Sequence, residues 1–422
     1  MKIDHLILLV SSLSMLTQAA DKLGFVFELV RHGARAPQKA QKDQFMVPEG
    51  MLTASGQRQR YLMGSLNKQR YIDIGLLDDT YNPAQIYIQS TNFFRTIQSS
   101  YAELIGIYPP SQKTKLNDGE KQSLKSGKGM PKLKIRNQGK TVDPGQDPME
   151  GFQYIPVFNY QTPDESDDLM TGGCKLIDEA DAYLFPRNDT YEPVADYIMP
   201  VLRKPIQVAY GLTDDQAWGL SYPQLYDYSD SQLAEDKEGI PRRYSYSAEE
   251  WFYMRNTQKW ALSLTFPQEY KKIFATKIMR NPLMNMHNRM NEINDGDKTR
   301  DSLRYFIYSA HDLQIANILE WLHPVGHDFV DVTYGSSIFF ELWYDTDCVN
   351  SLRDESCFKV KIIHNGMPLK LSTCLDANWY TRGSYDQICT YTDFRAHTTN
   401  FGYSGMPLHE KCAETFTPPS ME

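Results

Sequence analysis

The feature that most constrains this chain is the stretch GFVFELVRHGARAP, residues 24–37. It opens as an apolar run rich in phenylalanine and valine, which is typical of a buried strand. The run stops at RHGARAP, where two arginines, a histidine, a glycine and a proline follow one another closely. A fold that accepts this stretch must carry a buried strand to a sheet edge where those side chains have a use.

These residue types favour phosphate chemistry. Arg31 and Arg35 offer planar forks of donors that match phosphate oxygens. His32 offers a neutral ring nitrogen near physiological pH, which suits a nucleophile or a base. We expect Gly33 to let the backbone turn sharply beside the ring, and Pro37 to end the strand ladder. The alternative is a polar turn after an edge strand, but five fixed residues match by chance in roughly one in a few million windows.

The stretch resembles the signature of the histidine acid phosphatases. This family includes the prostatic and lysosomal acid phosphatases, the lysophosphatidic acid phosphatases and the fungal phytases. The resemblance implies that His32 is phosphorylated during turnover, and that Arg31 and Arg35 bind the substrate phosphate.

A second segment, QIYIQSTNFFRT at residues 85–96, alternates like a strand and then turns into a helix. The apolar face expected for that helix consists of Phe93, Phe94, Ile97, Tyr101 and Leu104. The segment resembles the family pattern R-S-T-D-x-x-R-T, which implies that Arg95 also binds phosphate. Gln89 and Asn92 replace the first and fourth residues of that pattern, which could alter the salt bridges that hold Arg95.

A third segment, LRYFIYSAHD at residues 303–312, is again an apolar strand that ends in a histidine, now followed by a carboxylate. Lone histidines are more often structural, but this segment resembles the family's Y-S-A-H-D, with Leu313 in place of the usual threonine. The resemblance implies that His311 binds phosphate as a cation and that Asp312 protonates the leaving oxygen. All three segments read as strand, polar turn and helix, so their charged residues are expected to meet at the carboxyl edge of one sheet.

The fold class predicted from these segments is an α/β sandwich with a mixed sheet and an inserted, mostly helical cap. We assign residues 20–164 and 299–422 to the α/β core and residues 165–298 to the cap. Residues 113–140 are rich in lysine and arginine and read as a loop. A solvated loop is favoured over one that attracts anions.

Other segments predict packing. Thr53 is the expected N-cap of a helix whose Tyr61, Leu62 and Leu66 would pack on the sheet. Residues 338–343 and 358–363 read as an antiparallel hairpin. Core packing is expected for four methionines on one helical run, Met279, Met284, Met286 and Met290.

The ends and charge of the chain indicate the secretory pathway. Residues 1–19 read as a signal peptide, and no later run is long and apolar enough for a membrane span, so no stable membrane anchor is expected. Asn188 begins a glycosylation sequon. The net charge of −9 argues against general nucleic-acid binding. The expected location is extracellular or the lysosomal lumen.

Six cysteines suit an oxidising compartment and allow fifteen pairings. Cys348 and Cys357 flank a polar turn between two strand-like runs, which makes a local bridge plausible. The family resemblance implies the two other pairs, Cys174–Cys412 and Cys374–Cys389.

The function predicted is an acid phosphatase that hydrolyses small-molecule phosphomonoesters through a phosphohistidine. The arginines supply positive charge, and five histidines without a motif (His323, His327, His364, His397 and His409) show no convincing metal spacing, so neither metal nor cofactor is expected. The alternatives are a phytase or a lysophosphatidic acid phosphatase of the same family, or an inactive secreted binding protein. A homodimer is compatible with the sequence, which does not determine the oligomeric state.

Overall fold

The structure, a computed structural model, describes residues 21–39, 44–126, 147, 149–162, 167–326, 332–374, 380–381, 384–385 and 388–418. The expected signal peptide, residues 127–140 of the basic segment and His327 lie outside the described residues.

The core is a mixed sheet in the strand order β2-β3-β1-β4-β5-β6, with β9 also paired to β5. The strands are β1 (Lys22–Arg31), β2 (Ile86–Ser90), β3 (Tyr305–Ala310), β4 (Ser337–Tyr344), β5 (Phe358–His364), β6 (Met367–Pro368) and β9 (Ile388–Thr390), and a separate pair joins β7 (Tyr380–Thr381) to β8 (Ser384–Tyr385). β2, β3 and β1 are parallel, whereas β4 and β5 are antiparallel to their neighbours. The predicted α/β class and the hairpin of residues 338–343 with 358–363 are confirmed.

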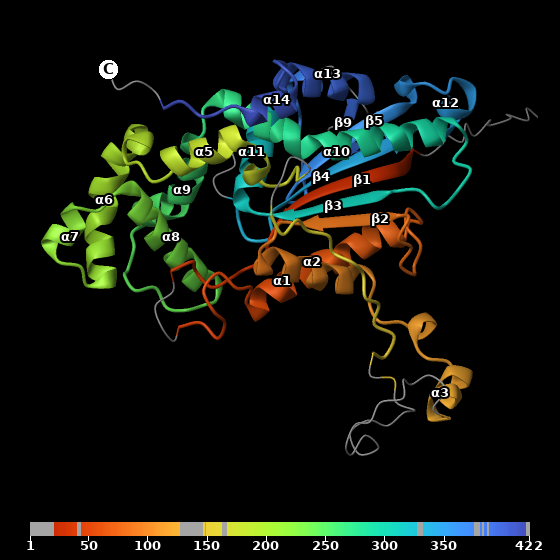
Figure 1. Ribbon diagram of the computed structural model, residues 1–422, viewed down its shortest axis with the longest axis horizontal. Helices are drawn as coiled ribbons and strands as arrows, with labels where there is room; N and C mark the ends of the chain where they lie inside the picture. The colour runs from red at the N-terminus through yellow and green to blue at the C-terminus, as the bar shows by residue number, and fades with distance from the viewer. Residues whose placement is uncertain are drawn as a thin grey trace, which may run out of the picture.

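Helices cover both faces of the sheet, and a further group lies at one end (Figure 1). The helices of the first part are α1 (Ala54–Asn67), α2 (Phe94–Ile107), α3 (Asp118–Lys125), α5 (Lys175–Leu184), α6 (Glu192–Tyr210), α7 (Asp214–Trp218), α8 (Tyr222–Lys237) and α9 (Ala248–Thr265). Those of the second part are α10 (Gln268–Asn294), α11 (Asp312–Leu322), α12 (Thr346–Ser351), α13 (Tyr391–Phe401) and α14 (Leu408–Ala413). α1 and α2 cover one face, and α10 and α13 cover the other (Figure 1).

The helices α6, α8 and α9 share an apolar cluster that is separate from the clusters on the sheet. α5 and α10 also fall within residues 165–298, yet their buried side chains join the sheet cluster. Three of the four methionines predicted for the core are buried on α10, and Met284 is exposed. The division of the chain at residues 165 and 298 stays a prediction.

Two expectations from apolar spacing were wrong. Tyr61, Leu62 and Leu66 on α1 are exposed, and so are Phe94 and Tyr101 on α2. The faces that pack inward carry many small and polar residues, such as Gly64 and Ser99, although Leu104 of the predicted face is buried as expected. A second difference lies in segment 113–140, where the described part contains α3, whose capping box Asn117–Glu120 supplies the start of a helix.

A buried polar cluster lies between the sheet and these two helices. Arg60 forms an ion pair with Glu103, and its nitrogen lies 3.7 Å from Oε1 of Glu28. Asn67 donates to both carboxylates, at 3.2 Å to Glu28 and 2.9 Å to Glu103, and the Tyr305 hydroxyl donates to Glu28. Two carboxylates therefore share one guanidinium in a buried site. Burial and the charge of Glu103 raise the pKa of Glu28 well above its ordinary value.

Three disulfides close the fold: Cys174–Cys412, Cys348–Cys357 and Cys374–Cys389. They are the pairs that the cysteine positions and the family resemblance predicted. The first ties the start of α5 to α14, which holds residues from the middle of the chain against its C-terminal part.

The Glu28→Gln variant tests the buried cluster. The raised pKa of Glu28 means that this carboxyl binds a proton more tightly in the folded protein than in the unfolded chain. Its contribution to the free energy of unfolding is complete below the unfolded pKa of about 4.3 and is lost as pH rises through the folded pKa. Between pH 4.5 and 7 the wild-type free energy of unfolding should therefore fall by up to about 1.4 kcal/mol per pH unit from this group.

In chemical denaturation across that pH range, Glu28→Gln should be close to wild type at acidic pH and should gain on it as pH rises. The control is the exposed Glu249→Gln, which should keep the wild-type slope. A Glu28→Gln protein that loses stability relative to wild type as pH rises would contradict this account.

Candidate active site

Three parallel strands end together at one edge of the sheet. Arg31 at the end of β1 pairs in register with Ala310 at the end of β3. On the other side of β3, Ser90 at the end of β2 pairs with Ser309. Side chains that follow these strands are therefore neighbours although they come from distant parts of the sequence.

The two predicted histidines meet at this edge. The ring centroids of His32 and His311 lie 5.5 Å apart. His311 Nε2 lies 2.9 Å from the Thr91 hydroxyl, and Arg95 Nη2 lies 3.4 Å from His311 Nδ1. Because the arginine only donates, Nδ1 accepts and Nε2 carries the proton, which makes His311 a neutral imidazole in this arrangement.

The tautomer of His32 follows from one contact. Its Nδ1 lies 2.8 Å from the carbonyl oxygen of Gly33, which can only accept, so Nδ1 carries the proton. The other ring nitrogen, Nε2, then holds an unshared electron pair. This is the form of histidine that can attack an electrophile.

Gly33 serves the site through close packing. It does not have a positive φ, so the sharp turn expected from the sequence does not explain it. A Cβ at Gly33 would lie 2.3 Å from the carbonyl oxygen of Gly56 on α1. The Gly33 N–H also donates to Ser99 on α2 at 3.0 Å. The segment after β1 is thus held directly against both helices.

Each of the two motif arginines is paired with a carboxylate. Arg31 Nη2 lies 2.6 Å from Asp312 Oδ2, and Arg31 Nη1 donates to the carbonyl oxygen of Val332. Arg35 binds Asp230 through two bonds, at 2.8 and 3.0 Å. Tyr334 lies between them, since its ring centroid is 4.5 Å from Cζ of Arg31 and 5.9 Å from Cζ of Arg35.

The arginines keep donors for a ligand. Nε of Arg31, Arg35 and Arg95 is buried in each case and has no hydrogen-bond partner within the described part of the chain. Buried donors without acceptors are costly, and an anion bound between the three guanidinium groups would satisfy them.

The charge of these arginines acts on the histidines. Burial, followed by Arg31 and Arg35, lowers the pKa of His32 well below its ordinary value. Burial and Arg95 lower the pKa of His311 in the same way. Burial and Arg35 lower the pKa of Arg95 to about 10. Burial and these arginines disfavour the imidazolium form of His311, so the expectation that His311 binds phosphate as a cation stays a prediction.

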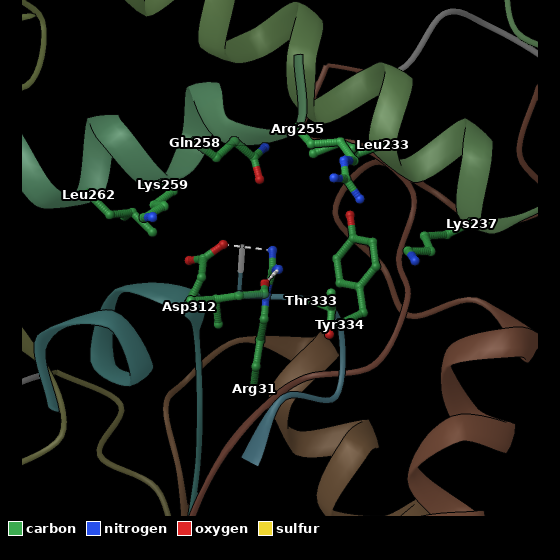
Figure 2. A pocket seen from close by; sticks show the side chains of 11 residues that line it. Arg31, Leu233, Lys237, Arg255, Gln258, Lys259, Leu262, Asp312, Thr333 and Tyr334 are labelled. Atoms are coloured by element: carbon green, nitrogen blue, oxygen red, sulfur yellow. Dashed lines mark hydrogen bonds and ion pairs between the residues drawn. The ribbon is translucent and has the colours of Figure 1, made fainter. Parts of the chain in front are cut away.

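A pocket opens beside Arg31 and Asp312 (Figure 2). The motif side of the pocket carries these two residues and Tyr334, and the opposite wall comes from α8 and α9. The wall residues are Leu233, Lys237, Arg255, Gln258, Lys259 and Leu262. His32 is 2% exposed, and it follows Arg31 of this lining directly in the chain.

The family model described as histidine phosphatase superfamily (branch 2) matches residues 22–365. The chain belongs to this branch of the histidine phosphatases. It is 36% identical over 119 residues to human lysosomal acid phosphatase, a match that covers 27% of this chain and 28% of that protein. To mouse prostatic acid phosphatase it is 36% identical over 109 residues, or 24% of this chain and 28% of that protein. The matched segments span little more than a quarter of these relatives.

Solved structures resemble this chain over almost its whole length. The phytase from Citrobacter braakii has a TM-score of 0.58 at 16% identity and covers 93% of this chain and 100% of its own. The Bifidobacterium longum multiple inositol polyphosphate phosphatase, in complex with inositol hexasulfate, has a TM-score of 0.55 at 12% identity and covers 94% of this chain and 96% of its own. At these identities the likeness shows the fold.

The structure therefore brings all six predicted site residues of the histidine phosphatase to one edge of the sheet: Arg31, His32, Arg35, Arg95, His311 and Asp312. Sequence reasoning missed Asp230, Tyr334 and Thr91, which contact them. Thr91 belongs to the matched R-S-T segment and could have been found there, whereas Asp230 and Tyr334 lie in segments without a motif.

Three other predictions concern parts of the protein away from this edge: glycosylation, metal binding and membrane spans. Asn188 is exposed, and its Oδ1 accepts a bond from the Tyr222 N–H at 2.8 Å, while its glycosylation stays a prediction. In the described ranges no cluster of three or more His, Cys, Asp or Glu side chains is arranged to hold a metal ion. No helix of those ranges has the length and apolar character to cross a membrane.

The lowered pKa of His32 can be tested by NMR titration of the free protein. His32 should remain neutral as pH falls well below 6.5, because burial and its arginine neighbours disfavour the imidazolium. Removing one of those charges in Arg31→Gln should raise the pKa of His32 toward its ordinary value. A His32 resonance that titrates near pH 6.5 in the wild type would show that the arginines do not act on it.

Proposed function

We propose that this histidine phosphatase is an acid phosphatase that hydrolyses phosphomonoesters through a phosphohistidine on His32. The supporting observation is the His32 ring itself. The Nδ1 proton is donated to the carbonyl oxygen of Gly33, so Nε2 is free to attack, and the arginines around the ring carry buried donors that have no partner among the described residues. This combines a nucleophile with a binding site for a phosphoryl group.

The chemistry follows from charge. Arg31, Arg35 and Arg95 bind the phosphate oxygens and neutralise charge that would otherwise repel the nucleophile. His32 Nε2 attacks phosphorus in line, so a P–N bond forms as the P–O ester bond breaks. Asp312 in its protonated form delivers a proton to the leaving oxygen, and it later assists the water that cleaves the P–N bond and releases phosphate.

His311 and Asp312 adjust when substrate enters. The substrate brings negative charge against His311, which favours the imidazolium that burial and the arginines disfavour. Arg31 can exchange its bond to Asp312 for a bond to phosphate, which frees the carboxyl for proton transfer. Protonated carboxyl groups become more abundant as pH falls, so activity on the acidic side of neutrality is expected.

The proposed location is extracellular or the lysosomal lumen. Its support is the set of three disulfides, which persist in oxidising compartments. A catalytically inactive secreted binding protein is the alternative from another class, and the following experiment separates the two.

The purified protein should hydrolyse para-nitrophenyl phosphate at acidic pH in the presence of EDTA, because the arginines supply the positive charge. Labelled substrate and a rapid quench should trap phosphate on His32, and His32→Ala should abolish both the trapping and the turnover. Asp312→Ala is the companion variant. It should still be labelled, because para-nitrophenolate is a good leaving group and needs little proton donation. Label on another residue, or activity that EDTA removes and a divalent ion restores, would refute the mechanism.

The pocket wall favours a narrower substrate class as a second candidate. Lys237, Arg255 and Lys259 line the side of the pocket that faces Arg31 and Asp312 (Figure 2). An alcohol that carries further phosphates could bind these cations while its first phosphate lies at His32. This supports the phytase alternative over the lysophosphatidic acid phosphatase, whose substrate carries a long apolar chain.

The comparison of two substrates tests this candidate. In Arg255→Met combined with Lys259→Met, kcat/KM for myo-inositol hexakisphosphate should fall by about tenfold or more, since a charge-assisted hydrogen bond contributes about 1.5–3 kcal/mol. kcat/KM for para-nitrophenyl phosphate should change by less than about threefold. The exposed Lys272→Met is the control. Equal losses on both substrates would assign these cations to the reaction centre instead.

A further inference from the structure

A buried ion pair connects the helical group to the phosphate site. Asp230 lies on α8, and Arg35 follows strand β1, yet the two side chains are only 4% and 3% exposed and form two bonds to each other. Ion pairs of this kind are costly to bury, so their geometry has to be well satisfied.

The Asp230 carboxylate is fully occupied. Oδ1 accepts from Arg35 Nη2 at 2.8 Å and from Gln258 Nε2 of α9 at 3.1 Å. Oδ2 accepts from Arg35 Nη1 at 3.0 Å and from the Gln38 N–H at 2.9 Å. Four donors leave the carboxylate no role in touching a substrate, and they fix its position from helix α9 and from the segment after β1.

The same contacts decide what Arg35 can offer. A guanidinium has five N–H donors. Asp230 takes one from each terminal nitrogen, and the carbonyl oxygen of Ala36 takes a second from Nη1 at 3.1 Å. The two donors that remain are Nε–H and the second Nη2–H, which lie parallel on one edge of the group. That edge is a bidentate fork, a pair of parallel N–H donors of the kind that binds phosphate.

We propose that Asp230 is a positioning residue, which holds Arg35 from the cap so that the free edge of its guanidinium binds the substrate phosphate. The proposal rests on the proposed function, because it concerns the phosphate site of that reaction. It gives the cap a part in catalysis: α8 must be docked for Arg35 to be oriented.

Docking of α8 alone is the competing explanation, and the chain offers a matched control. Glu238, at the end of the same helix, accepts from Thr53 at 2.7 Å and from Ser55 at 3.0 Å at the start of α1. This contact joins the same two parts of the protein without touching Arg35. Glu238→Gln therefore weakens docking and leaves the Arg35 fork intact.

The test compares Asp230→Asn with Glu238→Gln in the full-length protein. Asparagine turns one of the two acceptors into a donor that faces Arg35, so the guanidinium loses its orientation. kcat/KM for para-nitrophenyl phosphate should fall by about 10- to 100-fold, the loss that a misplaced binding group causes. The inhibition constant of inorganic phosphate should rise by a similar factor. Glu238→Gln should change both by less than about twofold.

A double-mutant cycle shows whether Asp230 acts through Arg35. In an Arg35→Lys background, where the fork is already absent, Asp230→Asn should cause little additional loss. Asp230→Glu, which keeps the charge and moves it by one methylene, should give an intermediate loss. It replaces Asp230→Asn if circular dichroism shows that the asparagine variant does not fold.

Three outcomes would overturn the proposal. Equal losses in Glu238→Gln would mean that docking alone matters, and additive losses in the Arg35→Lys background would mean that Asp230 acts elsewhere. Tighter binding of inorganic phosphate to Asp230→Asn would mean that the negative charge of Asp230 only weakens the attraction of the site for phosphate. Calorimetric binding of inorganic phosphate keeps the test independent of turnover, so a wild type without activity would refute the proposed function and leave this inference measurable.

Discussion

The site depends on the burial of positive charge at one sheet edge. Arg31 and Arg35 are each less than 5% exposed, and Arg95 is close enough to both for their charges to act on it. Guanidinium groups in such a place are stable only with counter-charges and complete hydrogen bonding. Asp312 supplies one counter-charge from the neighbouring strand-to-helix turn, and Asp230 supplies the other from the cap. The need to balance these cations therefore links the sheet, the cap and the chemistry.

A second group of buried charges lies between strand β1 and the helices α1 and α2. Glu28 on β1 lies against Arg60 and Glu103, so the face of the sheet under α1 and α2 is polar in the middle. These helices approach closely through glycine, which leaves Tyr61 and Leu62 of α1 and Phe94 of α2 on the outside. The arrangement places α1 and α2 near enough to hold the segment after β1, since Gly33 lies against Gly56 and donates to Ser99.

The predicted cap, residues 165–298, contributes to the site through two of its helices. Its helices α8 and α9 form the wall of the pocket and also supply the partner of Arg35. The same two helices thus carry the cations that we propose select the substrate, Lys237, Arg255 and Lys259, and the carboxylate that we propose positions Arg35, Asp230. A change in the cap can for this reason alter both the substrates that enter and the rate at which they react.

The sequence by itself determined the strands, turns and helix caps that depend on residues close to one another in the chain. The apolar runs before Arg31 and His311 indicated strands, and the polar residues after them indicated the sheet edge, because strand direction alone places such residues together. Thr53 was predicted correctly as an N-cap for the same reason, since its bond to the Gly56 N–H spans three residues. The three motifs then named six candidate residues, which the structure brings to one edge of the sheet.

Only the tertiary structure decided the contacts between distant segments. Spacing placed Tyr61 on an apolar face, but the close approach of α1 and α2 through small residues turned that face to solvent. Asp230 stands 195 residues from Arg35 without a motif around it, so nothing local shows that they form a pair. The charge state of His311 was likewise decided by burial and by three arginines from two other segments, because a pKa depends on everything that surrounds a group in space.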